Sequence, residues 1–269
     1  MLELTGHVAV VTGANHGIGA AVARRLAAQG AGVLVSYLRL PPLADPSLPA
    51  AYDESRTGGA GAVVAAISAA GGRVVAHEAD LTDAAAIAAL FDVAERDLGP
   101  VDIVVNNASG WKADTFLPQR ADAFGRRVAP LSAATVDANV GVDARAGALV
   151  IAELAHRLVA RGGRWGRIVG LTSGGPDGFP GEASYGAAKA ALENYTMTAA
   201  RELAGFGVTA NTVHPPVTDT GWITGAVRDF VAGDDHHTHV ADPDEVAGVV
   251  AWLCSDAARL VSGNVLRLR

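Results

Sequence analysis

Short runs of β-branched and other apolar residues alternate along the chain with longer Ala- and Leu-rich segments of helical period. The short runs are apolar on both faces, as strands of a parallel sheet covered by helices must be. The first half predicts strand–helix pairs at residues 8–11 and 18–29, 32–36 and 61–70, and 74–77 and 83–98. The second half predicts strands at 101–105, 167–171, 208–213 and 264–268, and helices near 135–161, 184–206 and 243–254. This pattern predicts an α/β fold, a Rossmann-type doubly wound parallel sheet flanked by helices on both faces.

Two segments interrupt the alternation, near residues 40–57 and near residues 116–130. The first contains four prolines, and both are predicted to be irregular loop insertions within one domain that spans residues 1–269. In open α/β sheets, ligands bind beyond the carboxyl ends of the strands. Because the second insertion follows the fourth predicted strand, we expect it to border the substrate cleft.

Composition excludes several classes of function. The formal net charge is −7 and no run of Lys or Arg is present, so a nucleic-acid partner is not expected. No apolar run is long enough for a membrane helix, and the N-terminus lacks the basic and apolar regions of a secretion signal. Cys254 is the only cysteine, which fits a reducing compartment and a buried small side chain. We therefore expect a soluble cytoplasmic protein without a membrane partner.

A glycine-rich turn lies between the first predicted strand and the first predicted helix, in the sequence Thr12-Gly13-Ala14-Asn15-His16-Gly17-Ile18-Gly19. Gly13 permits a tight turn, Gly17 lets the backbone approach a pyrophosphate, and Gly19 allows the helix to pack closely on the strand. Amides at the start of the helix then hold the anion. The turn predicts dinucleotide binding by Gly13, Asn15, His16, Gly17, Ile18 and Gly19.

Further motifs follow the turn in a fixed order, each after a strand or within a helix. They are Asp80-Leu81, Asn106-Asn107-Ala108, Asn139, Thr172-Ser173 and Tyr185-Gly186-Ala187-Ala188-Lys189. Together with the T-G-x-x-x-G-x-G turn, they resemble the short-chain dehydrogenase/reductase family, in particular its 3-oxoacyl-(acyl-carrier-protein) reductase-like branch, over nearly the whole chain. The resemblance implies that Asp80 and Leu81 contact the adenine and that Asn107 and Ala108 belong to the cofactor site. Ser109 stands where the family motif N-N-A-G has its glycine.

Tyr185 and Lys189 are four residues apart in a predicted helix, so their side chains project from the same face. A free phenol with a pKa of about 10 is a poor proton carrier at neutral pH, but a nearby ammonium and an oxidised nicotinamide favour the phenolate. We therefore predict that Tyr185 is the general acid and base of hydride transfer. The resemblance implies that Lys189 also binds the nicotinamide ribose, and that Asn139 holds a water that links Lys189 to solvent.

The hydroxyl that stabilises charge on the substrate oxygen is predicted to come from Ser173, with Thr172 as the alternative. Ser173 precedes Tyr185 by one position fewer than is common in the family, so both hydroxyls remain candidates.

The cofactor is predicted to be NADP(H) rather than NAD(H). NAD-preferring relatives carry an acid at the end of the second strand, whereas this chain has Ser36-Tyr37-Leu38-Arg39 there. Ser36 and Arg39 are expected to bind the 2′-phosphate. The turn supplies Asn15 and His16 where many NADP-binding relatives have an arginine.

The segment after the sixth strand resembles the part of the family that contacts the nicotinamide carboxamide. It contributes Pro215, Val217, Thr218 and Thr220 to the predicted cofactor site, and Pro216 replaces a glycine. Aromatic residues near strand ends are candidates for an apolar substrate pocket: Trp111, Phe116, Phe179, Trp222 and Phe230. The run His236-His237-Thr238-His239 admits a metal site, but a solvated loop is the preferred interpretation and no metal is expected.

These features predict an NADP(H)-dependent oxidoreductase that transfers hydride between nicotinamide C4 and a ketone or secondary alcohol, with a 3-oxoacyl thioester as a candidate substrate. The alternative is a dinucleotide-binding regulatory protein that has lost turnover, suggested by Ser109, Pro216 and the short Ser173–Tyr185 spacing. The resemblance also implies a homodimer or homotetramer.

Overall fold

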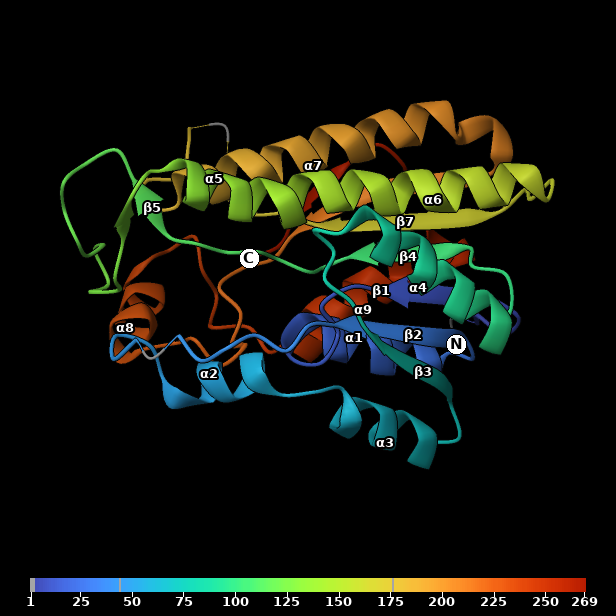
Figure 1. Ribbon diagram of the computed structural model, residues 1–269, viewed down its shortest axis with the longest axis horizontal. Helices are drawn as coiled ribbons and strands as arrows, with labels where there is room; N and C mark the ends of the chain where they lie inside the picture. Colours follow the sequence, from blue (N-terminus) through green and yellow to red (C-terminus); the bar gives the residue numbers. More distant parts are fainter. Residues whose placement is uncertain (1–2, 44, 176) are drawn as a thin grey trace.

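Strands with apolar side chains on both faces pair into a parallel sheet at the centre of the molecule (Figure 1). The computed structural model describes residues 3–43, 45–175 and 177–269, and in this part of the chain seven strands form the sheet in the order β3-β2-β1-β4-β7-β8-β9. Their bounds are β1 Val8–Val11, β2 Gly32–Tyr37, β3 Arg73–Glu78, β4 Ile103–Asn106, β7 Gly166–Leu171, β8 Val208–His214 and β9 Val265–Arg267.

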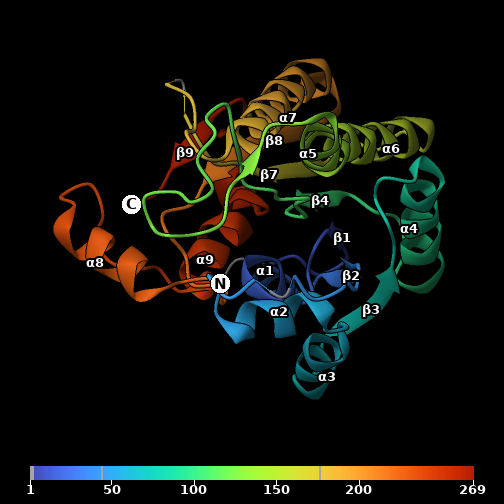
Figure 2. The same cartoon turned by 60° about the vertical axis from the view of Figure 1, so that its left-hand side comes forward.

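Helices cover both faces of this sheet (Figure 2). One face carries α1 Gly17–Ala28, α3 Gly61–Ala69 and α9 Pro243–Leu253; the other carries α4 Ala84–Asp97, α6 Gly147–Ala160 and α7 Ala183–Glu202. Successive side chains of a strand point to opposite faces, so Val11 packs with α1 and α9 while Val10 packs toward α4 and α6. The predicted doubly wound α/β fold is confirmed.

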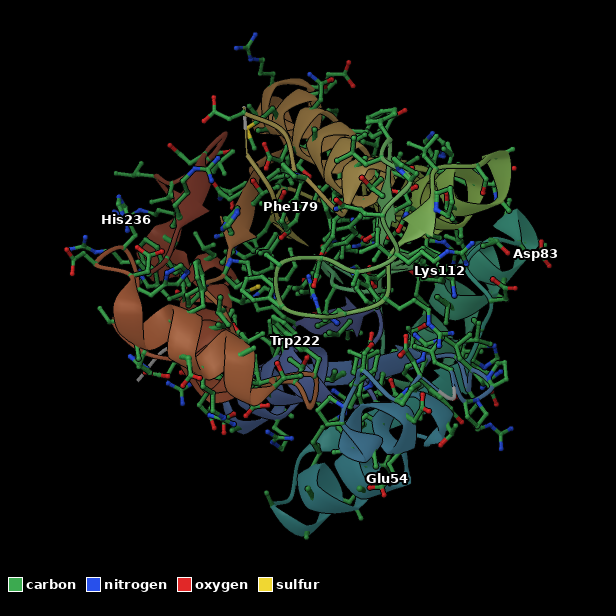
Figure 3. All side chains as sticks on the ribbon, turned by 90° about the vertical axis from the view of Figure 1, so that its left-hand side faces the viewer. Glu54, Asp83, Lys112, Phe179, Trp222 and His236 are labelled. Carbon is green, nitrogen blue, oxygen red and sulfur yellow. The ribbon has the colours of Figure 1, made fainter. Side chains whose placement is uncertain are left out.

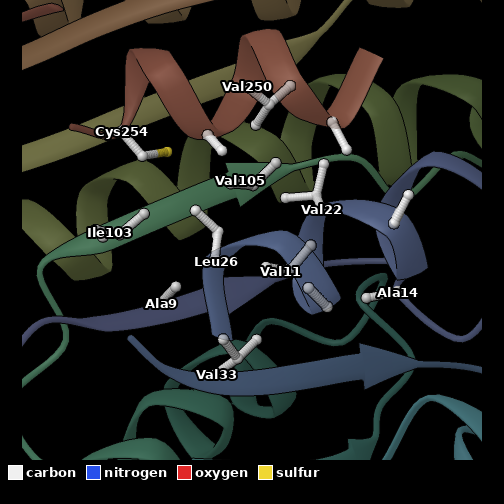
Figure 4. Close-up of a cluster of buried hydrophobic side chains, with 14 of the residues drawn as sticks. Ala9, Val11, Ala14, Val22, Leu26, Val33, Ile103, Val105, Val250 and Cys254 are labelled. Carbon is white, nitrogen blue, oxygen red and sulfur yellow. The ribbon is translucent and has the colours of Figure 1, made fainter. Parts of the chain in front are cut away.

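The core between the sheet and α1 and α9 consists of small and branched apolar side chains (Figure 4). Val22 and Leu26 of α1 face Val105 and Ile103 of the sheet, and Cys254 closes this layer beside α9. Cys254 is fully buried, and burial raises the pKa of its thiol to about 12. The cysteine therefore behaves as a packed small side chain.

The two insertions contain regular structure that the hydrophobic pattern does not predict. The first holds helix α2, Ala50–Thr57, which begins directly after Pro49, a residue tolerated at a helix start. The second runs between two short strands that pair with each other, β5 Asp114–Thr115 and β6 Ala129–Pro130. A further short helix, α8 Gly225–Gly233, was also not predicted.

The predicted long helix near residues 135–161 is divided into three parts. It consists of α5 Ala133–Asn139, a π-helical segment Val140–Ala146, and α6. A π-helical segment widens the backbone spiral, so side chains beyond it face a different direction from that of a continuous α-helix. This division changes which residue of the helix reaches the site described below.

The order of the sheet places the carboxyl ends of β1 and β4 side by side, with their helices on opposite faces. Such a switch point opens a crevice at the carboxyl edge of the sheet. In the described residues, no helix combines the length and the apolar character that crossing a membrane requires.

Candidate active site

The turn between β1 and α1 is built so that a ligand can approach its backbone. Gly13 and Gly17 have φ values of +62° and +55°, in the left-handed region that favours glycine. A Cβ on Gly13 would lie 2.8 Å from Ala108 Cα, and a Cβ on Gly17 would lie 2.9 Å from Thr220 Cγ2. Neither position accepts a side chain, so this cradle is formed by backbone alone.

Thr12 and Asn107 fix the turn against the end of β4. The amides of Asn107 and Ala108 both donate to Thr12 Oγ1 at 3.0 Å. The Asn107 side-chain Nδ2 donates to the carbonyl oxygens of Thr12 and Gly13, at 2.9 and 2.8 Å. The side-chain amide of Asn107 thus stabilises the conformation of the turn.

A cavity of about 1080 Å³ opens at this carboxyl edge. It gathers most of the residues that the sequence predicts, namely Gly13, Asn15, His16, Gly17, Ile18, Ser36, Asp80, Leu81, Asn107, Ala108, Ser173, Tyr185, Lys189, Pro215, Val217, Thr218 and Thr220. Three predicted residues are not in its lining: Gly19, Arg39 and Asn139. Gly19 packs against the carbonyl oxygen of Gly13, which agrees with its expected packing role.

Tyr185 and Lys189 face each other on the first turns of α7, with Lys189 Nζ 5.5 Å from the centre of the Tyr185 ring. Burial raises the pKa of Tyr185 to about 12, although the charge of Lys189 and a hydrogen bond with Ser173 both act to lower it. Lys189 does lower the pKa of Tyr185, as the sequence predicts, but burial raises this pKa by more. Tyr185 is therefore a protonated phenol at neutral pH.

Asp143, in the π-helical segment, is the buried partner of Lys189. Lys189 Nζ lies 2.8 Å from Asp143 Oδ1, and both side chains are almost completely buried. Nζ also donates to the carbonyl oxygen of Leu171 at 2.9 Å. Burial is the largest single influence and acts to lower the pKa of Lys189, but Asp143 and Tyr185 together outweigh it, so this pKa is raised and the ammonium stays charged.

The Asn139 side chain is held by backbone groups of two neighbouring segments. Its Nδ2 donates to the carbonyl oxygens of Lys112 and Thr135, both at 3.1 Å, and its Oδ1 accepts from the Lys112 amide at 3.0 Å. The side chain is fully buried and anchors the segment after β4. Among the described residues, the direct contact of Lys189 on this helix is with Asp143, four residues later. The water-mediated role of Asn139 stays a prediction.

The geometry distinguishes between the hydroxyls of Ser173 and Thr172 as candidates for contact with the substrate oxygen. The Ser173 hydroxyl is near enough to Tyr185 to lower the pKa of its phenol, and Ser173 lines the cavity. Thr172 also lines the cavity, but its buried hydroxyl donates to Glu193 Oε1 at 2.6 Å. Ser173 is therefore the better placed of the two to meet a substrate oxygen.

This difference gives a test in two variants. Ser173→Ala is expected to lower kcat for ketone reduction by about 10²-fold, the effect of removing one donor to a developing oxyanion. Thr172→Val is expected to leave kcat within about threefold of wild type and to lower the melting temperature, since Glu193 loses its hydrogen bond. Steady-state kinetics and thermal melts of both variants measure these effects, and a reversed order would assign the role to Thr172.

The cavity fits a dinucleotide at several independent positions. The cradle at Gly13 and Gly17 excludes side chains, and the buried Oγ of Ser36 has no hydrogen-bond partner among the described residues. Asp80 lies at the cavity wall, where its Oδ1 accepts from the amide and the hydroxyl of Thr82. These are an anion cradle and an unpaired polar atom at the positions expected for phosphate and ribose.

Arg39 points away from the cavity. Its guanidinium donates three hydrogen bonds to the carboxylate of Glu78 at 2.7–3.1 Å, and its backbone amide donates a fourth. The structure therefore does not bring Arg39 together with Ser36, although both were predicted to hold the 2′-phosphate.

The segment after β8 forms the opposite wall. Thr218 pairs with Ala241, and its hydroxyl donates to the carbonyl oxygen of Pro216 at 2.8 Å. Thr220 packs on Gly17, so this segment closes over the glycine turn. Pro216 is accommodated without a cis peptide bond in the described chain.

Aromatic side chains line the outer part of the cavity: Trp111, Phe179, Trp222 and Phe230 from the predicted set, joined by Tyr52 and Phe124. Phe116 is 83% exposed and lies outside it. Figure 3 shows Phe179, Trp222 and Lys112 around the centre of this face and His236 at its edge.

Arg126, in the second insertion, ties this loop to the site. It lies 2.7 Å from Asp122 and 2.8 Å from Glu182, at the start of α7, and its side chain is 11% exposed. Trp222 lies at 5.3 Å from the guanidinium carbon, within cation–π range. The insertion thus borders the cavity, as its position after β4 predicts.

The histidine run has local partners. His236 and His237 contact Asp234, and His239 contacts Glu245. Among the described residues, no three His, Cys, Asp or Glu side chains are grouped to hold a metal ion.

Comparison with known proteins identifies the family. A family model described as enoyl-(acyl carrier protein) reductase matches residues 50–268, and one described as short chain dehydrogenase matches residues 7–45. The chain belongs to the short-chain dehydrogenase/reductase family. Members of this family are oxidoreductases that act on alcohol and ketone groups, and the resemblance stated from the motifs is confirmed.

Individual short-chain dehydrogenase/reductase relatives match along nearly the whole chain. An uncharacterized oxidoreductase of Methylorubrum extorquens is 35% identical, with 99% of this chain and 97% of the relative covered. A 3-oxoacyl-(acyl-carrier-protein) reductase of Synechocystis is 31% identical, with 100% and 97% covered. The crystal structure of a blue fluorescent protein from a metagenomic library, in complex with NADPH, is 30% identical with a TM-score of 0.80, and 99% and 97% are covered.

Proposed function

We propose that this short-chain dehydrogenase/reductase is an NADP(H)-dependent carbonyl reductase in which Tyr185 transfers the proton. The observation that carries the proposal is the arrangement of Tyr185, Ser173 and Lys189 at one end of a cavity that also contains the glycine cradle. NADPH bound in this cavity would supply the hydride from nicotinamide C4.

Tyr185 and Ser173 act on the substrate oxygen. Because the phenol stays protonated well above neutral pH, it can donate its proton as negative charge develops on the carbonyl oxygen. The Ser173 hydroxyl donates to the same oxygen and stabilises that charge. The raised pKa favours reduction at neutral pH, whereas alcohol oxidation needs the phenolate and is favoured at alkaline pH.

Lys189 acts through its fixed charge. Asp143 and the Leu171 carbonyl hold the ammonium beside the Tyr185 ring, where it stabilises the phenolate that remains after proton transfer. Its third proton is available for a hydroxyl of the nicotinamide ribose.

The substrate is proposed to be a ketone with an apolar body, and a 3-oxoacyl thioester is one such compound. The aromatic wall supports this, as does the 3-oxoacyl-(acyl-carrier-protein) reductase among the relatives. The NADPH bound by the metagenomic relative supports NADP(H) as the cofactor.

We also propose a homodimer or homotetramer that forms in the cytoplasm. Leu149 on α6 and Leu260 near β9 are exposed apolar side chains on the elements that the family uses for assembly. Size-exclusion chromatography with light scattering measures the subunit number.

The proposed function predicts NADPH oxidation by the purified protein with apolar ketones, including a 3-oxoacyl thioester. Initial rates with NADPH and with NADH, across a panel of ketones, provide the measurement. Cofactor binding without turnover of any ketone would favour the regulatory alternative. That alternative also requires Tyr185→Phe to leave every measured property unchanged.

A further inference from the structure

Helix α2 of the first insertion lies directly on the glycine turn. Asn15 Nδ2 donates to the carbonyl oxygens of Ser55 and Gly58, at 3.3 and 2.9 Å. The Leu40 amide donates to the carbonyl oxygen of Arg56 at 3.0 Å. These bonds fix the last turn of α2 above the end of β2 and the start of α1, where a dinucleotide carries its phosphates.

This last turn brings Arg56 into the cavity, where its side chain interacts with Tyr52 but pairs with no carboxylate of the described residues. Arg56 lines the cavity, and its guanidinium carbon lies 5.7 Å from the centre of the Tyr52 ring. Its Nε is buried and has no hydrogen-bond partner among the described residues, which also contain no carboxylate within ion-pair distance of it. Two other cations of the cavity differ, since Arg126 is paired with two carboxylates and Lys189 with Asp143.

Two basic groups of the cavity lie within reach of the Arg56 charge. Burial, and then the charge of Arg56, lower the pKa of His16 below its usual value. The same two causes lower the pKa of Lys112. The buried Arg56 Nε lacks a hydrogen-bond partner among the described residues, and His16 and Lys112 both lie near the charge of Arg56. A bound anion would stabilise such a group of donors.

Arg39 is not placed to bind an anion in the cavity. The Arg39 guanidinium is hydrogen-bonded to the Glu78 carboxylate, and the Arg39 side chain is not part of the cavity lining. Arg56 is an arginine that the fold presents to the cavity beside the glycine turn, where Asn15 bonds the end of α2. Arg126 and Arg269 line the cavity as well.

We propose that Arg56 is a phosphate ligand of the bound dinucleotide, and that α2 forms one wall of the cofactor site. The proposal rests on the proposed cofactor. A guanidinium donates to phosphate oxygens through a planar fork, and both the 2′-phosphate of NADP(H) and the pyrophosphate common to both cofactors offer such oxygens. The same chemistry serves either phosphate.

The test measures binding rather than turnover. Isothermal titration of wild type and Arg56→Ala with NADPH, NADH, 2′,5′-ADP and ADP gives the Kd of each ligand. Loss of a charged hydrogen bond is expected to weaken binding by about 10- to 100-fold. A loss confined to NADPH and 2′,5′-ADP assigns the 2′-phosphate, and a loss shared by NADPH, NADH and ADP assigns the pyrophosphate.

Three further variants complete the design. Arg56→Lys keeps the charge without the fork and is expected to recover part of the affinity. Arg24→Ala removes an exposed arginine of α1 outside the cavity and is expected to bind all four ligands as wild type does. Arg39→Ala examines the arginine predicted from sequence. Thermal melts report the fold of each variant.

The proposal is overturned if Arg56→Ala binds all four ligands within about twofold of wild type, or no more weakly than Arg24→Ala. It is also overturned if the loss appears in Arg39→Ala and not in Arg56→Ala. Failure of wild type to bind either NADPH or NADH would instead refute the proposed cofactor, so the two failures are distinguishable.

Discussion

Replacement of Tyr185 by phenylalanine is expected to lower kcat/KM for NADPH-dependent ketone reduction by about 10²–10⁴-fold, the range for loss of a positioned general acid. The change removes the phenolic hydroxyl and keeps the ring, which packs 6.1 Å from Phe179. Binding of NADPH should change by no more than about twofold, because the ring continues to fill the same space. Initial-rate kinetics and NADPH titration of the same preparation measure both quantities.

Tyr195→Phe is the matched control, since Tyr195 lies on the same helix and is 46% exposed at the surface. It should retain the activity of wild type. If Tyr185→Phe reduces ketones as fast as Tyr195→Phe, the proton comes from another group, and the role proposed for Tyr185 is wrong.

The strands and the long helices could be predicted from sequence because burial imposes a clear pattern on them. Strands such as Val8–Val11 are buried at every position, and α4 shows buried residues at helical spacing. Helix α2 contains no fully buried residue, so no apolar periodicity marks it. It is fixed by hydrogen bonds with Asn15 and Leu40, which are contacts made only in the folded chain.

The candidate site could be predicted where a motif lies next to a strand end. The glycine turn follows β1 directly, and Tyr185 and Lys189 lie within two turns of one helix, so local spacing was sufficient. The sequence did not identify Asp143 as the partner of Lys189, because the direction of the Asp143 side chain depends on the π-helical segment. A continuous α-helix from residue 135 does not reveal which side chain meets Lys189.

Arg39 and Arg56 show a second limit of sequence reasoning. Arg39 follows β2, where a phosphate ligand is expected, but β2 pairs with β3 in a register that brings Glu78 opposite Tyr37. This pairing places a carboxylate beside Arg39. Nothing in the local sequence shows that Glu78 occupies the guanidinium, or that α2 carries Arg56 into the cavity instead.

Asp143→Asn is expected to lower the free energy of unfolding by about 3–5 kcal/mol at pH 7, because it leaves the buried Lys189 ammonium without its counterion. Thermal or urea unfolding measures this loss. Asp137→Asn, an exposed acid on α5, is the matched control and should unfold as wild type does. A loss below about 1 kcal/mol would show that the ion pair does not compensate for burial of the lysine.

The same substitution also changes the pH dependence of catalysis, and the direction follows from the charges. The Asp143 carboxylate raises the pKa of both Tyr185 and Lys189, so its removal lowers the pH at which this coupled pair releases its first proton. Alcohol oxidation requires that proton to be absent. The kcat/KM profile for oxidation in Asp143→Asn should therefore rise at a lower pH than in wild type, whose profile still climbs above pH 9 because the Tyr185 pKa is about 12. If Asp143 has only a structural role, the oxidation profile of Asp143→Asn loses amplitude but keeps the midpoint of the wild-type profile. If Asp143 acts through its charge, the midpoint of the variant lies at a lower pH than that of wild type, even after the loss of stability is taken into account.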